Sequence, residues 1–229
     1  MSDSIIVAKP DGQAQQLMLL LHGVGSTASD LVPLGRVLAE EFPAAFIVSI
    51  AAPEPSHVPG GRQWFSVMGI DDDNRPERIA AAMPAFVDTV RHWQQQAGVG
   101  TDAVALVGFS QGGIMALEST RDRPALAGRV VSIAGRFAQL PVQANEGTTL
   151  HLFHGKADPV IPYGFTVEAA QHLVGIGADV TADVVPFVGH QINDDIVALV
   201  IERLRGHLPK RTWEAALRAA KDVSGRETH

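Results

Sequence analysis

Three residues of the chain have the side-chain types that nucleophilic catalysis needs, and each follows an apolar, strand-like segment. They are Ser110, Asp158 and His190. A serine hydroxyl is a weak nucleophile at neutral pH, and it becomes reactive when a neutral imidazole takes its proton. A carboxylate on the other ring nitrogen fixes the tautomer of that imidazole and stabilises its charged form. The three residue types together predict nucleophilic chemistry on a serine.

The segment around Ser110 carries the strongest of these signals. Residues 108–113 read GFSQGG, directly after the apolar run 103–107 and before a helical pattern at 113–118. A G-x-S-x-G sequence between a strand and a helix is typical of a nucleophile elbow, a strained turn that lifts the serine hydroxyl above the sheet. The glycines at 108 and 112 let the backbone cross closely there.

A second glycine turn lies upstream, where the apolar run 16–21 ends in the sequence HGVG at 22–25. Such a turn, together with the residue after the nucleophile, can direct two backbone amides at a developing oxyanion. These amides would belong to Val24 and Gln111. Both are backbone donors, so their side chains are free to vary.

The other histidines and aspartates fit the roles of base and acid less well. The chain has nine histidines; we expect His22 to brace the glycine turn and His154 to lie at a strand end. Asp183 falls within a strand pattern, and Asp194 with Asp195 opens the helix after His190, where negative charge complements the helix dipole. Asp158 and His190 therefore remain the preferred acid and base.

Composition narrows the class of protein. The chain has 229 residues, 46% of them apolar, a net charge of −7 and no cysteine. The absence of a basic cluster makes nucleic acid and anionic membranes poor partners. Neither a signal peptide nor a membrane-spanning run is visible, so we expect a soluble cytoplasmic protein. No Cys cluster, H-E-x-x-H or EF-hand pattern is present, and we expect no metal ion or cofactor.

Strand and helix patterns alternate along the chain, which predicts an α/β fold with a mostly parallel sheet covered by helices on both faces. We expect one domain over 1–229, with a core at about 16–208. An amphipathic helix at about 210–221 is expected to pack on that domain, with a dimer contact as the alternative. Pro84 predicts a kink or break in the helix at 77–97. The expected strands are 5–8, 17–21, 46–50, 103–107, 130–133, 149–153 and 180–185, and the other helices are 29–41, 113–118, 165–176 and 191–205.

Three loops bear on a site. Residues 134–148 are too few to form a cap domain, so the site should be open. Trp64 and Phe65 lie in a long proline-bounded loop, where they could wall an acyl groove or pack on the core. The acidic run at 71–74 lacks the ligand spacing of an EF-hand, and we expect it to be a solvated loop.

With these motifs, the chain resembles the phospholipase/carboxylesterase family of α/β-hydrolases, and most closely its small bacterial esterases. The matching segments are LHGVG at 21–25, RQWF at 62–65, GFSQGG at 108–113, HGKADPV at 154–160 and GH at 189–190. The resemblance implies an α/β-hydrolase fold without a cap domain, with Ser110, Asp158 and His190 as the triad. It also implies Val24 and Gln111 as oxyanion donors and Trp64 in an acyl groove.

The resemblance implies a serine carboxylesterase that acts on short- to medium-chain acyl esters through an acyl-serine. A lysophospholipase or an acyl-protein thioesterase is the enzymatic alternative, and Arg136 argues against long lipidated substrates. A non-catalytic binding protein is the alternative of a different class; it would be expected to have lost part of the triad or oxyanion hole. The partner would be a small acyl ester or thioester. Oligomeric state stays open.

Overall fold

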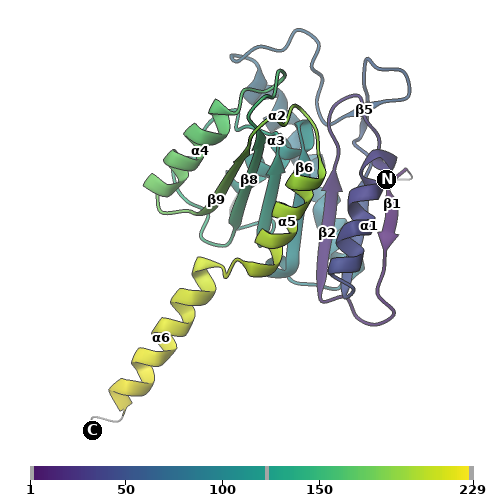
Figure 1. The fold of residues 1–229 in the computed structure, drawn as a ribbon. Helices are drawn as coiled ribbons and strands as arrows, with labels where there is room; N and C mark the ends of the chain where they lie inside the picture. The colour runs from purple at the N-terminus through teal and green to yellow at the C-terminus, as the bar shows by residue number, and fades with distance from the viewer. Residues whose placement is uncertain (1–2, 122–123, 227–229) are drawn as a thin grey trace.

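The computed structural model describes residues 3–121 and 124–226, and a seven-stranded sheet lies at its centre (Figure 1). The strand order is β1-β3-β2-β6-β7-β8-β9. In chain order the sheet strands are β1 (Ile5–Ala8), β2 (Gln16–Leu21), β3 (Ala45–Ile50), β6 (Val104–Phe109), β7 (Arg129–Ile133), β8 (Thr149–Gly155) and β9 (Asp179–Val185).

All neighbouring strands pair in parallel except β1, which pairs antiparallel with β3 at one edge. Strand β2 pairs with β3 on one side and β6 on the other, and its residues Leu17–Leu21 are buried because helices cover both faces of the sheet. This explains the continuous apolar run in the sequence, because a parallel strand covered on both faces has no polar side.

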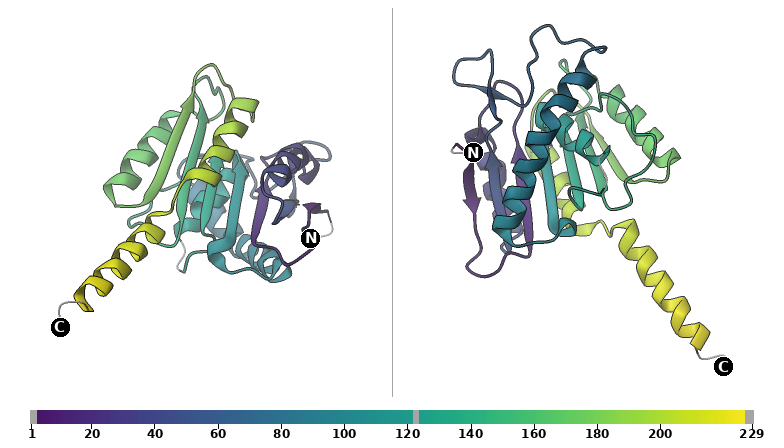
Figure 2. Two further views of the ribbon diagram at one scale, coloured as in Figure 1. Left: turned by 60° about the horizontal axis from the view of Figure 1, so that its bottom comes forward. Right: turned by 180° about the vertical axis from the view of Figure 1, so that it is seen from behind.

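Helices cover both faces of the sheet (Figure 2), and a separate hydrophobic core lies between the helices and the sheet on each face. Helices α1 and α5 pack on one face, with Leu38 and Val200 among the buried residues; α2, α3 and α4 pack on the other, with Phe86 and Met115. The helices are α1 (Val32–Glu41), α2 (Arg75–Ala97), α3 (Gln111–Glu118), α4 (Gly164–Gly175), α5 (Asp194–Gly206) and α6 (Lys210–Arg226), with short 3-10 turns at Ala28–Leu31, Thr101–Ala103 and Ser119–Arg121.

The carboxyl edge of the parallel strands brings together loops that are far apart in sequence. The turns after β2, β6, β8 and β9 all leave the sheet at this edge. Residues 134–148, between β7 and β8, contain neither helix nor strand. This segment therefore carries no cap domain, and the carboxyl edge of the sheet is not roofed by one.

The helix that contains Pro84 is not broken there, although a break was one of the two outcomes expected from the sequence. Helix α2 runs without a break from Arg75 to Ala97, with Pro84 inside it. Proline costs a helix the hydrogen bond to the carbonyl four residues earlier, here that of Ala80. Ala80 and Pro84 both lie on the exposed side of α2, so water can hydrate this carbonyl. The loop before α2 also contains a short antiparallel pair, β4 (Glu54–Pro55) with β5 (Arg62–Gln63).

The C-terminal helix corrects the expectation that it packs on the domain. Helix α6 projects away from the body of the molecule (Figures 1 and 2). Its apolar side chains Trp213 and Leu217 are 57% and 47% exposed. Its first turn holds polar contacts to the sheet, through Lys210 and Arg211.

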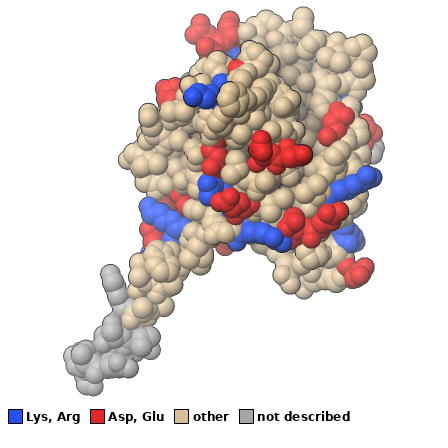
Figure 3. Space-filling model, in the orientation of Figure 1, with Lys and Arg blue, Asp and Glu red and all other residues tan. Residues whose placement is uncertain are grey.

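Acidic and basic side chains are interspersed on the face shown in Figure 3, which carries no extended patch of one sign. Among the described residues, none of the helices combines the length and the apolar character that a membrane crossing needs.

Candidate active site

Ser110 occupies the turn between β6 and α3 in a conformation that few non-glycine residues adopt. Its backbone angles are φ 52° and ψ −117°, outside the regions that L-residues populate freely. The turn is held from both sides, because the Ser110 amide donates to Ile133 at 2.9 Å and the Ser110 carbonyl accepts from Ile114 at 2.9 Å. The strained serine is therefore fixed at the N-terminus of a buried helix.

Two glycines make this turn sterically feasible. A side-chain carbon on Gly108 would overlap the backbone of Gly112, and one on Gly112 would overlap the carbonyl of Leu21. The elbow thus needs glycine at these two positions because backbone segments pass within contact distance of each other.

His190 lies between Ser110 and Asp158 and contacts both. Its Nε2 is 3.0 Å from the Ser110 hydroxyl, and its Nδ1 is 2.7 Å from Oδ2 of Asp158. The strand ends therefore bring the three predicted residues into one chain of hydrogen bonds. With Nδ1 protonated and donating to the carboxylate, Nε2 is the acceptor that faces the hydroxyl.

Asp158 is held as a carboxylate by its surroundings. Its side chain is fully buried, and Oδ1 accepts the amides of Val160 at 2.8 Å and Ile161 at 2.9 Å. Burial alone raises the pKa of this carboxyl, but the hydrogen bonds from His190, Ile161 and Val160 together outweigh it, so its pKa lies below the ordinary value. The acid is therefore ionised at neutral pH and can stabilise a charged His190.

A second imidazole, which the sequence reasoning did not place there, also contacts Asp158. Nε2 of His154 lies 3.2 Å from Oδ2 of Asp158 and 2.8 Å from the Ile161 carbonyl, and Nδ1 lies 2.7 Å from the Thr166 hydroxyl. Burial lowers the pKa of His154, which keeps it neutral. One feature of the sequence could have indicated this contact: His154 precedes Asp158 by only four residues, at the start of the same loop.

The two predicted oxyanion donors lie beside Ser110. Val24 and Gln111 line the same cavity as the serine, and an added carbon on Gly23 would touch the Ser110 side chain. Gln111 is the first residue of α3, where an amide has no acceptor within the helix. Within residues 3–121 and 124–226, nothing accepts a hydrogen bond from the Val24 amide. Both amides are thus available to a ligand oxygen.

The Gln111 side chain has a structural role that the sequence did not indicate. Its carbonyl oxygen accepts from the Trp64 amide at 2.8 Å, and its amide group donates to the Phe65 carbonyl at 2.7 Å. This pair of bonds ties the 62–65 segment to the elbow. His22 braces the neighbouring turn, as expected, through Gly23 and the amide of Ala52.

Of the two aromatic residues expected to wall a groove, only Phe65 lines the cavity. Trp64 is 3% exposed, donates from its indole to the His22 carbonyl at 2.9 Å and packs edge-on against Phe86. The expectation that Trp64 forms part of the groove is therefore corrected. A buried indole needs a hydrogen-bond acceptor, and the turn at His22 supplies one inside the core.

The cavity beside Ser110 has a volume of about 210 Å³. Its wall combines apolar side chains with two arginines, Arg75 and Arg136. The sequence did not predict that Arg75 lines this cavity. Asp72 belongs to the acidic loop that was expected to be solvated. Its side chain is 80% exposed, and it also forms ion pairs with both arginines. The further apolar lining residues are Phe65, Val67, Ile114, Val160, Ile161, Pro162 and Phe165.

The rejected acids lie elsewhere. Asp183 receives two hydrogen bonds from Arg203, at 3.0 and 2.8 Å. Asp194 and Asp195 lie in the first turn of α5, where their charge complements the helix dipole.

Comparison with known proteins agrees with this geometry. Residues 2–208 match the phospholipase/carboxylesterase family. The chain is 48% identical over 219 residues to the esterase YpfH of Escherichia coli (strain K12), covering 96% of this chain and 94% of that protein. It is 26% identical over 215 residues to an acyl-protein thioesterase 1 of Gibberella zeae, covering 85% and 91%.

Among solved structures, esterase PE8 superposes with a TM-score of 0.77 at 29% identity, covering 87% of this chain and 97% of that one. The chain thus has the α/β-hydrolase fold. It belongs to the phospholipase/carboxylesterase family and is an ester hydrolase of the serine type.

Proposed function

We propose that this protein hydrolyses short- to medium-chain carboxylic esters through an acyl intermediate on Ser110. The observation that carries the proposal is the position of His190, within hydrogen-bond distance of both the Ser110 hydroxyl and the buried Asp158 carboxylate. That arrangement is what a serine nucleophile needs, since nucleophile, base and orienting acid form one chain.

In the first half of the reaction, His190 Nε2 takes the hydroxyl proton as Ser110 Oγ attacks the ester carbonyl carbon. The carbonyl oxygen becomes negatively charged and accepts hydrogen bonds from the amides of Val24 and Gln111, next to a helix N-terminus that favours negative charge. His190 then gives its proton to the departing alcohol, which leaves the acyl group on Ser110.

In the second half, water replaces the alcohol. His190 takes a proton from the water as the oxygen attacks the acyl-serine, and then returns that proton to Ser110 as the acid leaves. Asp158 keeps its negative charge throughout and stabilises the imidazolium that forms in each half.

The cavity supports short acyl chains. Pockets that enclose drug-sized ligands are usually about 300–1,000 Å³, and this one is about 210 Å³. Each buried methylene contributes about 0.8 kcal/mol, so the gain in binding should end once the cavity is full.

A lysophospholipase or acyl-protein thioesterase would use the same triad, and the likeness to acyl-protein thioesterases favours it as the second candidate. The cytoplasmic location expected from the sequence stays a prediction.

The proposal is tested by 4-nitrophenyl esters and matching thioesters of graded chain length, from acetyl to palmitoyl, with wild type and Ser110→Ala. We expect kcat/KM to peak at short to medium chains, and the variant to lose about 10⁴–10⁶-fold in kcat. Near-wild-type turnover by a folded Ser110→Ala protein would contradict the mechanism. A steady rise in kcat/KM toward palmitoyl substrates would favour the second candidate.

A further inference from the structure

The cavity beside Ser110 contains more positive charge than an uncharged acyl chain needs. Arg75 and Arg136 both line it. Arg75 lies at the start of α2 and Arg136 in the loop after β7, so two distant parts of the chain bring guanidinium groups to one wall. Within the described residues, a single carboxylate, Asp72, forms ion pairs with them.

Arg75 is the less satisfied of the two. Its side chain is 19% exposed, its Nε is buried without a hydrogen-bond partner, and the Asp72 carboxylate lies 3.6 Å from that nitrogen. Burial, followed by the nearby charge of Arg136, lowers the pKa of Arg75. A buried donor that lacks an acceptor costs free energy, and a bound anion would supply the acceptor.

Arg136 is held in place and lines the same cavity. Its guanidinium lies over the ring of Phe165 at 4.3 Å from the centroid, and its side chain is 11% exposed. It donates to Asp72, whose side chain is 80% exposed. Solvent screens an exposed carboxylate, so Asp72 offsets the two buried charges only in part.

We propose that the preferred ester substrate carries a free carboxylate on a short chain, which Arg75 and Arg136 bind while the ester carbonyl lies at Ser110. This inference rests on the proposed esterase function and narrows its substrate class. A planar carboxylate matches the paired donors of a guanidinium. The apolar wall formed by Phe65, Ile114 and Phe165 suits the few methylenes between carboxylate and ester.

The carboxylate could belong to the acyl or to the alcohol part of the ester, and two matched pairs of substrates distinguish these sources. The first pair is the 4-nitrophenyl half-ester of glutaric acid and 4-nitrophenyl pentanoate, which have acyl chains of equal length. The second pair is 3-acetoxypropanoate and propyl acetate. In one pair or the other, we expect the anionic ester to have a kcat/KM about tenfold or more above that of its neutral partner, as for a hydrogen bond to a charged group.

Substitutions assign the preference to residues. Arg75→Gln and Arg136→Gln should each lower the ratio of the two kcat/KM values, and the double variant should abolish the preference. Arg91→Gln is the matched control: Arg91 is exposed on the same helix, roughly 24 Å along its axis from Arg75, and its substitution should leave the ratio unchanged. Added salt should lower the ratio by screening the charge.

The outcomes separate this inference from the esterase proposal. Hydrolysis of neutral and anionic esters at equal kcat/KM in both pairs would overturn the carboxylate inference and leave the esterase proposal intact. A preference that persists in both single variants and in the double variant would overturn the assignment to these arginines. No hydrolysis of any of the four esters by folded wild-type protein would overturn the esterase proposal itself.

Discussion

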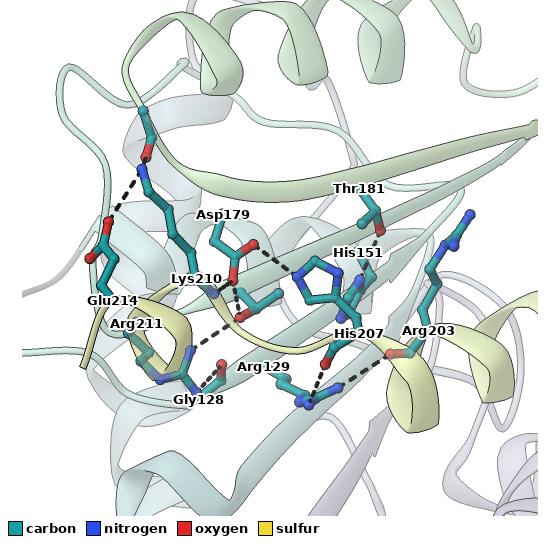
Figure 4. Close-up of polar contacts among 12 residues, drawn as sticks. Gly128, Arg129, His151, Asp179, Thr181, Arg203, His207, Lys210, Arg211 and Glu214 are labelled. Atoms are coloured by element: carbon teal, nitrogen blue, oxygen red, sulfur yellow. Dashed lines mark hydrogen bonds and ion pairs between the residues drawn. The ribbon is translucent and has the colours of Figure 1, made fainter. Parts of the chain in front are cut away.

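Two histidine–aspartate pairs lie at opposite edges of the same sheet, and only one is placed for catalysis. At the carboxyl edge, His190 contacts Asp158 at 2.7 Å. At the amino edge, His207 contacts Asp179 at 2.9 Å, within the polar cluster shown in Figure 4. The residue pair and its spacing are nearly the same, so the difference must come from what surrounds each pair.

Each pair has a neighbouring hydroxyl group, but the hydroxyl contacts the histidine in one pair and the aspartate in the other. Ser110 contacts the histidine, so the imidazole can take its proton. Thr149 instead donates to the carboxylate of Asp179 at 2.6 Å, and its oxygen accepts from Arg211. A hydroxyl held by a carboxylate and a guanidinium has no base positioned to activate it.

The amino-edge pair helps to anchor the start of α6 to the sheet. Asp179 also accepts the Lys210 amide at 2.9 Å. Arg129 donates to the carbonyls of Leu204 and His207. A histidine–aspartate pair is thus a catalytic candidate only when its second ring nitrogen faces a nucleophile in an open cavity. Where the carboxylate instead binds a threonine hydroxyl and a backbone amide, as Asp179 does, the pair is structural.

Removing each imidazole in turn should give the largest contrast. His190→Ala should lower kcat by about 10⁴–10⁶-fold, since no base remains for Ser110. His207→Ala should leave kcat unchanged and lower the free energy of unfolding by about 1–3 kcal/mol, because Asp179 loses a hydrogen-bond partner. Steady-state kinetics and urea unfolding measure the two effects. Equal loss of kcat in both folded variants would contradict the comparison.

Neutralising each carboxylate tests the same contrast with a smaller change in shape. Asp158→Asn should lower kcat by about 10⁴-fold, because an amide no longer fixes the His190 tautomer or stabilises its charge. Asp179→Asn should lower the free energy of unfolding and leave kcat unchanged. The two variants are compared by kcat on one ester and by urea midpoint. Retained kcat in Asp158→Asn would show that another group orients His190.

Acid should act on stability through the amino-edge cluster. Burial, reinforced by the nearby His207 and Arg129, lowers the pKa of His151 from 6.5 to about 3. Between these values the unfolded chain binds a proton at His151 that the folded protein does not, so the free energy of unfolding falls as pH falls. From about pH 7 to about pH 4.5 this contributes a loss of about 2.5 kcal/mol.

His151→Gln should remove that part of the pH dependence, measured by urea unfolding at both pH values. His57→Gln, at an exposed position, is the control and should change nothing. If His151→Gln has the same pH dependence as wild type, then His151 binds its proton equally in the folded and unfolded states, and its pKa is not lowered by folding.

Sequence patterns predicted the features that depend on local geometry. The GFSQGG elbow was visible because a strained turn with crossing backbones leaves glycine at fixed positions, here Gly108 and Gly112. The positions of Asp158 and His190 followed from the ends of apolar strands, since parallel strands end at one edge. Their convergence with Ser110 is therefore a consequence of topology that the sequence already carried.

Features that depend on contacts between distant segments were missed. The position of its loop left Trp64 either in a groove or on the core, and the family resemblance implied the groove. Phe86 and the His22 carbonyl hold it in the core. Arg75, at the start of α2, and Arg136, in the loop after β7, line the same cavity, and no local sequence pattern predicts that they come together. The amphipathic period of α6 shows an apolar face but does not specify which surface, if any, that face covers.

The most direct test of the central claim is to trap the acyl group on the protein. Wild-type protein mixed with 4-nitrophenyl acetate and quenched in acid within the first turnover should gain the mass of one acetyl group. Peptide mapping should place that group on Ser110, and Ser110→Ala should gain none. An acetyl group on another residue, or rapid turnover without any acylated protein under conditions where nitrophenol is released in a burst, would contradict the account.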